Sequence, residues 1–346
     1  MHSRWGEMMK KITVVSPCFN EQDNVRNCWA EVKRIFDEEM PGYEREHVFV
    51  DNASTDETVA ILREIAATDP CVKVVVNARN FGVFRSTFNG LNYATGDATL
   101  VMLPVDLQDP PEHLPEFVRL WEQGYEVVAG ARSTRQESLV MRACRWVFYR
   151  TVNSLSNFEL SPDVGEFQLI DRKVLKAVLS HNDHYPYIRG IIASCGFRRI
   201  IVPYTWRVRK VGVSKHRLPT LIDQALNGIF SFTRVPMRLC TFAGIILSAL
   251  CILFSLVTAV AYFTAHEFIP RGTTTMIVAL FFLSGVQLLF IGMLGEYVTS
   301  IHSQVRGGPL VIERERINIG SDAPVARTGP SHPSQPARAA GTPIDA

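Results

Sequence analysis

Two long stretches without a charged residue constrain this chain of 346 residues more than any other feature. The first covers residues 239–263 and the second covers 275–295. Each is longer than the roughly 20 residues with which an α-helix crosses the hydrocarbon core of a bilayer. A pair of buried helices in a soluble core is the weaker alternative, because soluble helices of this length nearly always carry a polar face. We therefore predict a two-helix transmembrane hairpin over about 239–263 and 274–296.

The basic residues around this pair predict its orientation. The linker between the two stretches carries one permanent cation, Arg271. Five arginines flank the pair on its outer sides: Arg234, Arg238, Arg306, Arg314 and Arg316. Segments rich in Lys and Arg stay on the cytoplasmic side of a membrane. We therefore predict that both termini are cytoplasmic and that the linker lies on the far side.

Two further segments adjoin the predicted hairpin. Residues 217–238 place apolar side chains at helical spacing, which is typical of an amphipathic juxtamembrane helix lying at the membrane interface. A helix packed on the core of a soluble domain would show the same spacing, so that alternative stays open. Residues 300–346 form a C-terminal segment with a short extended piece and then a tail rich in Ser, Pro, Ala and Gly. We expect disorder from about residue 318.

The first 216 residues alternate between strand-like and helix-like segments. Runs rich in β-branched residues predict four strands, at 12–16, 47–50, 72–76 and 99–103. A helical stretch follows each strand, at 22–39, 56–67, 83–94 and from about 112 onward. Strands that alternate with helices of this length indicate βαβ units. We therefore predict an α/β domain over 1–216 with a mostly parallel sheet.

Polar residues crowd the positions directly after these four strands. The segments are PCFNE (17–21), DNASTD (51–56), NARNFG (77–82) and DLQD (106–109). Ligands bind at the carboxyl ends of parallel strands, and carboxylates gathered there repel one another unless a cation or a ligand lies among them. Asp56 could equally cap the helix that follows it. No G-x-G-x-x-G or G-x-x-x-x-G-K-[ST] follows a strand, which disfavours a dinucleotide-binding or P-loop fold.

Composition excludes several other classes of protein. The chain has 36 Lys and Arg against 34 Asp and Glu, a formal charge of +2 that disfavours nucleic acid as a partner. Hydrophobic residues make up 47% of the chain, so its bulk is not intrinsically disordered. Seven cysteines without a C-x-x-C pair indicate neither a disulfide framework nor a zinc cluster, and they favour a reducing compartment.

The segments after the strands, together with three later motifs, resemble glycosyltransferase family 2. The matching pieces are SPCFNE, VDNASTD, RNFG (79–82), DLQDPP, GEFQLIDR (165–172), YIRG ending at Gly190, and R-x-x-G-x-SK (209–215). DLQDPP and R-x-x-G-x-SK followed by two spans are similar to the polyprenyl-phosphate branch, which includes dolichol-phosphate-mannose-synthase-like enzymes and the bacterial glucosyl- and aminoarabinosyl-lipid enzymes. The resemblance implies the GT-A fold of nucleotide-diphospho-sugar transferases.

This resemblance also implies a reaction. It is the inverting transfer of a sugar from a nucleotide sugar, UDP-linked rather than GDP-linked, to a polyprenyl phosphate such as undecaprenyl phosphate. The enzyme would work at the cytoplasmic face of the cell inner membrane and supply a lipid-linked sugar for modifying cell-envelope glycans. The sequence identifies neither the sugar nor the length of the lipid carrier. We also expect a homo-oligomer, with a tetramer as one candidate, and a flippase of the lipid-linked sugar is a candidate partner.

The same resemblance assigns roles to individual residues. Four of them would hold the nucleotide: Pro17, Glu21, Asp51 and Asn80. Asp106 would bind Mg²⁺ or Mn²⁺ with Gln108 as a second ligand, since hard cations take oxygen ligands. A divalent cation neutralises the charge that develops on a diphosphate leaving group. Arg132 would hold the diphosphate and Glu166 would orient the sugar or the acceptor, so that Asp106, Glu166 and Arg132 form the expected catalytic set.

Two positions depart from the pattern of the family. Many relatives carry Asp two residues before the aspartate that matches Asp106, where this chain has Pro104. Three consequences stay open: Asp109 and the diphosphate complete the metal shell, metal affinity is reduced, or catalysis is lost. Glu166 stands where Asp is more usual in relatives, and the extra methylene moves the carboxylate by about 1.5 Å.

A basic segment provides the expected acceptor site. No acidic residue lies between Asp183 and Asp223, whereas Arg and Lys are frequent there. Three of these cations fall in the family-like motifs and would bind the phosphate of the lipid: Arg189, Arg209 and Lys215. Generic attraction to anionic headgroups would account for the others. Because the second pKa of a phosphate monoester is near 6, the nucleophile is already anionic and needs no strong general base.

Two other functions stay open. A processive polysaccharide synthase shares the fold, but it carries Q-x-x-R-W and more membrane spans, whereas this chain has RACRW over 142–146 and two predicted spans. A catalytically inactive scaffold that binds sugar nucleotides and recruits a membrane partner is supported by Pro104 alone.

Overall fold

The computed structural model describes most of the first 216 residues and parts of the chain beyond them. The described residues are 9–133, 163–181, 183, 186–207, 242, 244, 246, 250, 253, 273–305 and 308–320. The predicted interfacial helix over 217–238 lies outside them, as do two of the expected acceptor residues, Arg209 and Lys215.

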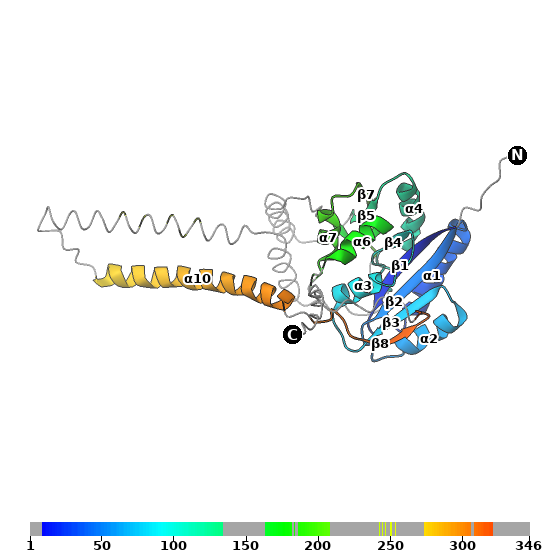
Figure 1. Ribbon diagram of the computed structural model, residues 1–346, viewed down its shortest axis with the longest axis horizontal. Coiled ribbons are helices and arrows are strands. Elements are labelled where there is room, and N and C mark those ends of the chain that lie inside the picture. The colour runs from blue at the N-terminus through cyan, green and yellow to red at the C-terminus, as the bar shows by residue number, and fades with distance from the viewer. Residues whose placement is uncertain are drawn as a thin grey trace, which may run out of the picture.

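Within these residues, eight strands form one sheet in the order β7-β5-β6-β4-β1-β2-β3-β8 (Figure 1). The strands are β1 (Lys10–Cys18), β2 (Tyr43–Asp51), β3 (Val72–Asn77), β4 (Ala98–Leu100), β5 (Val127–Arg132), β6 (Val164–Asp171), β7 (Arg199–Tyr204) and β8 (Glu313–Ile317). β4, β1, β2 and β3 run parallel to one another, and β5 runs parallel to β7. β6 runs antiparallel to β4 and β5, and β8 runs antiparallel to β3.

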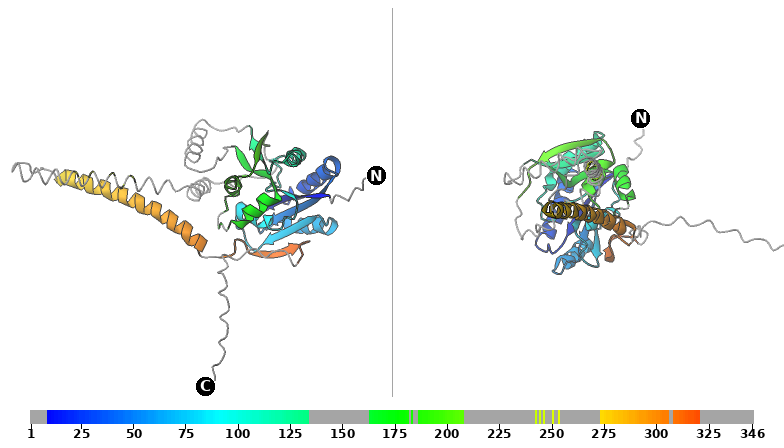
Figure 2. Two further views of the ribbon diagram at one scale, coloured as in Figure 1. Left: turned by 45° about the horizontal axis from the view of Figure 1, so that its top comes forward. Right: turned by 90° about the vertical axis from the view of Figure 1, so that its left-hand side faces the viewer.

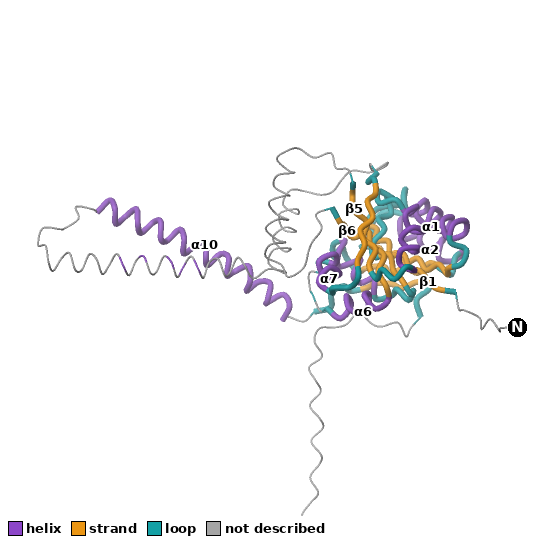
Figure 3. The backbone as a smooth tube through the Cα atoms, turned by 90° about the horizontal axis from the view of Figure 1, so that it is seen from above, coloured by secondary structure: helices purple, strands orange, loops and turns teal. Residues whose placement is uncertain are grey.

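Helices cover both faces of this sheet. They are α1 (Val25–Glu39), α2 (Thr58–Thr68), α3 (Val83–Leu91), the short 3₁₀ helix η1 (Pro111–His113), α4 (Leu114–Glu122), α6 (Arg172–Ser180) and α7 (Ile188–Ser194). A further helix, α10 (Thr273–Val305), follows later in the chain and projects away from the sheet (Figure 1). Figure 3 shows α1 and α2 on one side of the sheet and α6 and α7 on the other. The sheet and these helices therefore form a three-layer α/β structure.

The alternation of side chains along the strands explains the two covered faces. Ile12 and Val14 of β1 pack in the core beneath α1, α2 and α4, whereas Val15 packs in the core beneath α3, α6 and α7. Successive side chains of a strand point to opposite faces, so a strand covered on both faces is apolar along its whole length. Such nearly continuous apolar runs are what predicted these strands in the sequence.

The predicted α/β domain with a mostly parallel sheet is confirmed. The predicted strands at 12–16, 47–50 and 72–76 lie inside β1, β2 and β3, and the strand predicted at 99–103 overlaps β4. The helices α1 to α4 follow them as expected. The sequence prediction did not include β5, β6 and β7, which extend the sheet beyond β4.

The chain returns to the sheet after α10. β8, the extended piece expected in the C-terminal segment, lies along β3 at the edge of the sheet (Figure 2). Residue Asn318 follows it and donates hydrogen bonds to the carbonyls of Ala66 and Val72, at 2.7 and 2.9 Å. The ordered chain therefore extends at least to Gly320.

The predicted membrane hairpin lies largely outside the described residues. Of its first helix the structure describes five residues, all helical, between positions 242 and 253. Judged on the described residues alone, no helix is both long enough and apolar enough to cross a membrane. The two-span hairpin thus stays a prediction.

A buried histidine lies within the parallel part of the sheet. His47 of β2 is fully buried, and its Nε2 lies 2.9 Å from the hydroxyl of Ser16 on β1. Its Nδ1 has no hydrogen-bond partner among the described residues. Burial lowers the pKa of His47 to about 3, and the charge of Arg45 adds to this effect. The fold therefore holds His47 in its neutral form.

Mild acid should destabilise the fold through His47. The unfolded chain binds a proton at this residue below pH 6.5, whereas the folded protein binds it only below about pH 3. Between these values His47 lowers the free energy of unfolding by about 1.4 kcal/mol for each pH unit of acidification. In urea unfolding between about pH 7 and about pH 5, a His47→Gln variant should lose less stability than the wild type. Equal pH dependence of the two proteins would contradict this.

Candidate active site

The directions of the strands bring the predicted site residues to one edge of the sheet. Cys18 at the end of β1 pairs with Asp51 at the end of β2, and Asp51 pairs with Val76 near the end of β3. β6 runs the opposite way, so its beginning, with Glu166, lies at the edge where its neighbours β4 and β5 end. Arg132 ends β5 at the same edge. This edge is the candidate active site.

The loop after β2 is held by the carboxylate of Asp51. This side chain is fully buried, and it accepts hydrogen bonds from the backbone N–H of Ser54 at 2.9 Å and from the Ser54 hydroxyl. Burial raises the pKa of Asp51, and the bonds from Ser54 only partly offset this. Ala53 between them has φ +64°, a conformation that a non-glycine residue adopts only when its surroundings hold it there.

The loop after β1 is bonded to the loop after β2. Asn20, with φ +53°, accepts a hydrogen bond from the N–H of Thr55 at 2.8 Å and donates its own N–H to Ser54 at 2.9 Å. The N–H of Glu21 donates to the hydroxyl of Thr58 at 2.9 Å. The carboxylate of Glu21 accepts from the amide of Asn24 at 2.6 Å. The two loops thus form one rigid wall of the site.

Three asparagines extend this wall to the loop after β3. The side-chain amide of Asn77 donates to Asn52 at 3.2 Å, and that of Asn52 donates to Asn80 at 2.9 Å. Asn52 and Asn80 in turn accept from the N–H groups of Phe81 and Gly82, both at 2.9 Å. Gly82 has φ +88°, which a glycine adopts without strain. Asn52 and Asn77 were missed as site residues, although both stand at the end of a strand.

The turn after β4 presents the predicted metal ligands. Asp106 and Gln108 are both half-buried, and the carboxylate of Asp106 accepts from the N–H of Gln108 at 3.3 Å. Between them Leu107 has φ +53°, and its N–H donates to the carbonyl of Pro104 at 3.0 Å. No cluster of three His, Cys, Asp or Glu side chains suited to a metal occurs among the described residues. One carboxylate fits a Mg²⁺ or Mn²⁺ that takes its other ligands from water and a substrate diphosphate.

Asp109, expected as a third metal ligand, is engaged with protein groups. Its carboxylate is 1% exposed and accepts from the hydroxyl of Tyr204 at 2.6 Å and from Nη2 of Arg132 at 3.2 and 3.4 Å. Nε of Arg132 also donates to the Tyr204 oxygen at 3.2 Å, which closes a triangle of three side chains. Arg132 lies over the ring of Trp206, 5.0 Å from its centre. No role was predicted for Tyr204 or Trp206, because their positions depend on the pairing of β5 with β7.

Asp109 stabilises the protonated forms of the other two side chains of this triangle. Burial works against the charge of Arg132, but Asp109 and Tyr204 outweigh it, so the pKa of Arg132 is raised. Burial also raises the pKa of Tyr204, and the negative charge of Asp109 adds to this. Tyr204 therefore stays protonated and can keep donating to Asp109. Arg132 stays cationic at the edge of the site.

Glu166 and Arg189 lie together on the same side of the site. Nε of Arg189 is 3.7 Å from the Glu166 carboxylate, which is nearly buried. Nε also donates to the hydroxyl of Tyr187 at 2.7 Å, and Nη1 donates to the carbonyl of Val164 at 3.3 Å. The structure thus joins an expected catalytic residue to an expected acceptor residue.

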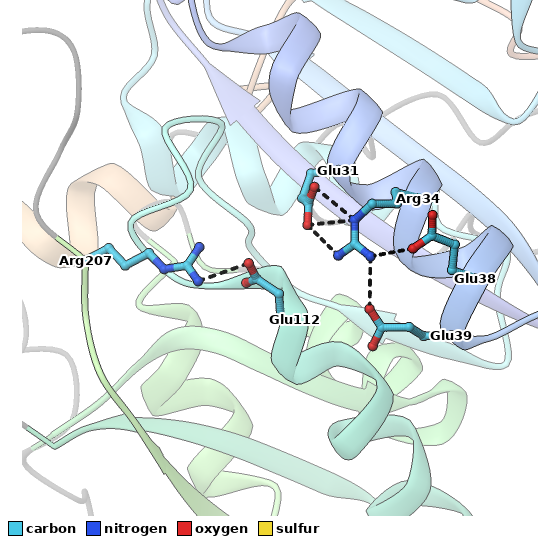
Figure 4. A network of polar contacts seen from close by, with 6 residues as sticks. All are labelled: Glu31, Arg34, Glu38, Glu39, Glu112 and Arg207. Carbon is cyan, nitrogen blue, oxygen red and sulfur yellow. Dashed lines mark hydrogen bonds and ion pairs between the residues drawn. The ribbon is translucent and has the colours of Figure 1, made fainter.

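Other cations of the basic segment have structural partners. Arg207 forms an ion pair of 3.0 Å with Glu112, near the surface network in which Arg34 of α1 contacts three glutamates (Figure 4). The guanidinium of Arg198 lies over the ring of Tyr125, 4.4 Å from its centre. Arg198 and Arg207 thus contact residues outside the Glu166 side of the site, whereas Arg189 contacts Glu166 itself. An open pocket of about 500 Å³ lies beside Tyr204 and Arg207.

Comparison with known sequences agrees with this architecture. Residues 13–179 match the family described as Glycosyl transferase family 2, and residues 235–301 match the GtrB C-terminal hairpin. The uncharacterized glycosyltransferase YkcC of Bacillus subtilis is 31% identical over 308 residues, which are 89% of this chain and 94% of YkcC. The chain belongs to glycosyltransferase family 2. The family and the transferase class indicated by its motifs are thus confirmed.

Two further proteins are similar over most of the chain. The bactoprenol glucosyl transferase of Shigella phage SfX is 32% identical, with 88% of this chain and 99% of that protein covered. Among solved structures, the mannosyltransferase PcManGT from Pyrobaculum calidifontis in complex with GDP-Man and Mn²⁺ is 19% identical. The superposition covers 86% of this chain and 87% of PcManGT, with a TM-score of 0.44.

The Asp109 triangle can be tested by removing one hydroxyl. Tyr204→Phe leaves the buried Asp109 carboxylate without its shortest hydrogen bond, so we expect the free energy of unfolding to fall by about 1–3 kcal/mol. Tyr43→Phe is the matched control, because Tyr43 donates at 3.2 Å to Glu122 in an exposed contact. The control should change stability by less than about 0.5 kcal/mol. Equal losses in denaturant unfolding would contradict a special role for Tyr204.

Proposed function

We propose that this family 2 glycosyltransferase moves a sugar from a nucleotide sugar, UDP-linked rather than GDP-linked, to a polyprenyl phosphate of the undecaprenyl type. One observation carries the proposal. The loops expected to bind the donor and the Glu166–Arg189 pair expected to face the acceptor lie on a single edge of the sheet. The name of the phage relative, a bactoprenol glucosyl transferase, supports a lipid acceptor.

The donor would lie against the wall formed by the loops after β1, β2 and β3. Pro17, Glu21, Asp51 and Asn80 are the residues we assign to the nucleotide. Hydrogen bonds between these loops set the wall before a ligand arrives, so little conformational entropy is lost on binding. Asp51 is buried, which favours a role in shaping the wall next to the base rather than a solvent-exposed contact.

Asp106, with Gln108, would hold Mg²⁺ or Mn²⁺ against the diphosphate of the donor. The cation supplies neutralisation of the charge that develops on the diphosphate as the sugar leaves. Arg132 stays cationic beside this turn and adds a second positive charge for the diphosphate. In this arrangement Asp109 serves the metal site indirectly, because it holds Arg132 in place.

The acceptor phosphate would enter from the side of Arg189, joined by Arg209 and Lys215. Its anionic oxygen attacks the anomeric carbon from the face opposite the diphosphate, and the configuration of the sugar inverts in one displacement. Since the phosphate is already largely ionised at neutral pH, Glu166 is needed to orient the reactants rather than to remove a proton. The contact with Arg189 holds the Glu166 carboxylate in position for that task.

A membrane hairpin would bring the lipid to this site. The match of residues 235–301 to a C-terminal hairpin supports two spans at about 239–263 and 274–296, with both ends in the cytoplasm of a bacterial cell. Along α10, which projects away from the sheet, many large apolar side chains are exposed (Figure 1). Leu280, Leu288 and Ile291 are 63%, 68% and 56% exposed, as expected of side chains that face lipid.

The proposed metal dependence predicts two losses of activity. Chelation by EDTA should stop transfer of labelled sugar to polyprenyl phosphate, and Asp106→Asn should reduce the rate by about 100-fold or more. Asp23→Asn, in an exposed position of the loop after β1, is the control and should leave the rate within about twofold. Full activity in EDTA and in Asp106→Asn would refute the metal assignment. Nucleotide binding without any transfer in the wild type would instead favour the inactive scaffold suggested by Pro104.

A further inference from the structure

The strand β8 reaches the candidate donor wall although it lies beyond α10 in the chain. Its first residue, Glu313, pairs with Asn77, the last residue of β3. The loop 78–82, which contains Asn80 and follows Asn77, begins at this point. We propose that Glu313 is a positioning residue, through which the C-terminal strand sets the conformation of the 78–82 loop and the affinity for the nucleotide. This inference rests on the proposed function, because it takes the 78–82 loop as part of the donor site.

The first contact lies where the loop begins. The N–H of Ala78 donates to the carbonyl of Ile312 at 2.8 Å, and Nη2 of Arg314 donates to the carbonyl of Ala78 at 3.3 Å. Both backbone groups of Ala78 are thus bonded to the C-terminal segment. Without that segment the loop would begin at an unpaired edge strand.

The second contact lies at the C-terminal end of α3, the helix that follows the loop. The carboxylate of Glu313 accepts from the amide of Asn89 at 2.6 Å and from the hydroxyl of Tyr93 at 2.6 and 2.8 Å. Arg316 on the same strand completes its surroundings at 2.5 Å. The Glu313 side chain is 8% exposed, so these are buried, charge-assisted hydrogen bonds. Asn89 belongs to α3, and Tyr93 lies two residues beyond its end.

β8 holds Ala78, the first residue of the loop 78–82, and it also holds the C-terminal end of α3, the helix that follows the loop. The C-terminal strand therefore helps to fix the position of α3 relative to β3, the two elements that the loop connects. Within the loop, the Asn80 side-chain oxygen accepts from the N–H of Gly82 and from the amide of Asn52. A shift of α3 relative to β3 would break this part of the wall.

The same strand offers a contact that lacks these properties. Glu315 pairs with Arg63 of α2 at 2.6 Å, with side chains 36% and 53% exposed. This pair attaches β8 to the sheet at the surface and touches neither end of the 78–82 loop. Exposed pairs of this kind contribute little to stability. Glu315 is therefore the matched control for Glu313.

The test compares nucleotide affinity in the full-length protein. Glu313→Ala and Tyr93→Phe should each raise the Kd for UDP roughly three- to tenfold in titration calorimetry with Mn²⁺ present. The double variant should be little worse than Glu313→Ala alone, because Glu313→Ala already removes the partner of the Tyr93 hydroxyl. Glu315→Ala should leave the Kd within about twofold. In transfer assays the KM for the donor should rise in Glu313→Ala while the KM for the lipid stays unchanged, a selectivity that mere loss of stability would not produce.

The possible outcomes distinguish failure of the inference about Glu313 from failure of the proposed function. If Glu313→Ala lowers the melting temperature but leaves the Kd for UDP unchanged, Glu313 has a structural role only and the inference is wrong. Equal effects of Glu313→Ala and Glu315→Ala on the Kd would overturn it as well. If the wild type binds neither UDP nor GDP, the proposed function fails before the variants are compared.

Discussion

The directions of the strands are the constraint on which the rest of this protein depends. Four parallel strands end at one edge of the sheet, and the antiparallel β6 and β8 begin there. Residues from widely separated segments of the chain can therefore gather at this one edge. Reversing β6 would move Glu166 to the opposite edge, away from the turn that carries Asp106.

A rigid core supports loops that are strained. Asn20, Ala53 and Leu107 each have positive φ, at a cost on the order of 1 kcal/mol or more for each residue. All three lie after strands at the candidate active site. A hydrogen bond from the neighbouring loop holds Asn20, and a bond from Ser54 to Asp51 closes the turn that contains Ala53. Buried apolar side chains on both faces of the sheet provide the stability that offsets this strain. Strain of this kind is typical of sites whose geometry is set before the ligand binds.

Local patterns in the sequence indicated the loops of the candidate site and missed the contacts between distant segments. Strand ends are visible as apolar runs followed by polar residues, and the resemblance to glycosyltransferase family 2 selected Glu21, Asp51, Asn80 and Asp106 from these segments. Tyr204 lies 95 positions from Asp109, and Glu313 lies 220 positions from Tyr93, so no local pattern connects them. The engagement of Asp109 with Arg132 was hidden for the same reason. Arg209, Lys215 and the two spans stay predictions, because they lie wholly or largely outside the described residues.

The central claim is that one edge of the sheet brings a nucleotide sugar and a lipid phosphate together for direct transfer. The most direct test supplies the detergent-solubilised protein with polyprenyl phosphate and a panel of radiolabelled UDP- and GDP-sugars, with and without Mn²⁺ or Mg²⁺. The account predicts metal-dependent label in the lipid phase from one UDP-sugar, with the anomeric configuration inverted. Absence of label from every donor, in a preparation that still binds nucleotide, would contradict it.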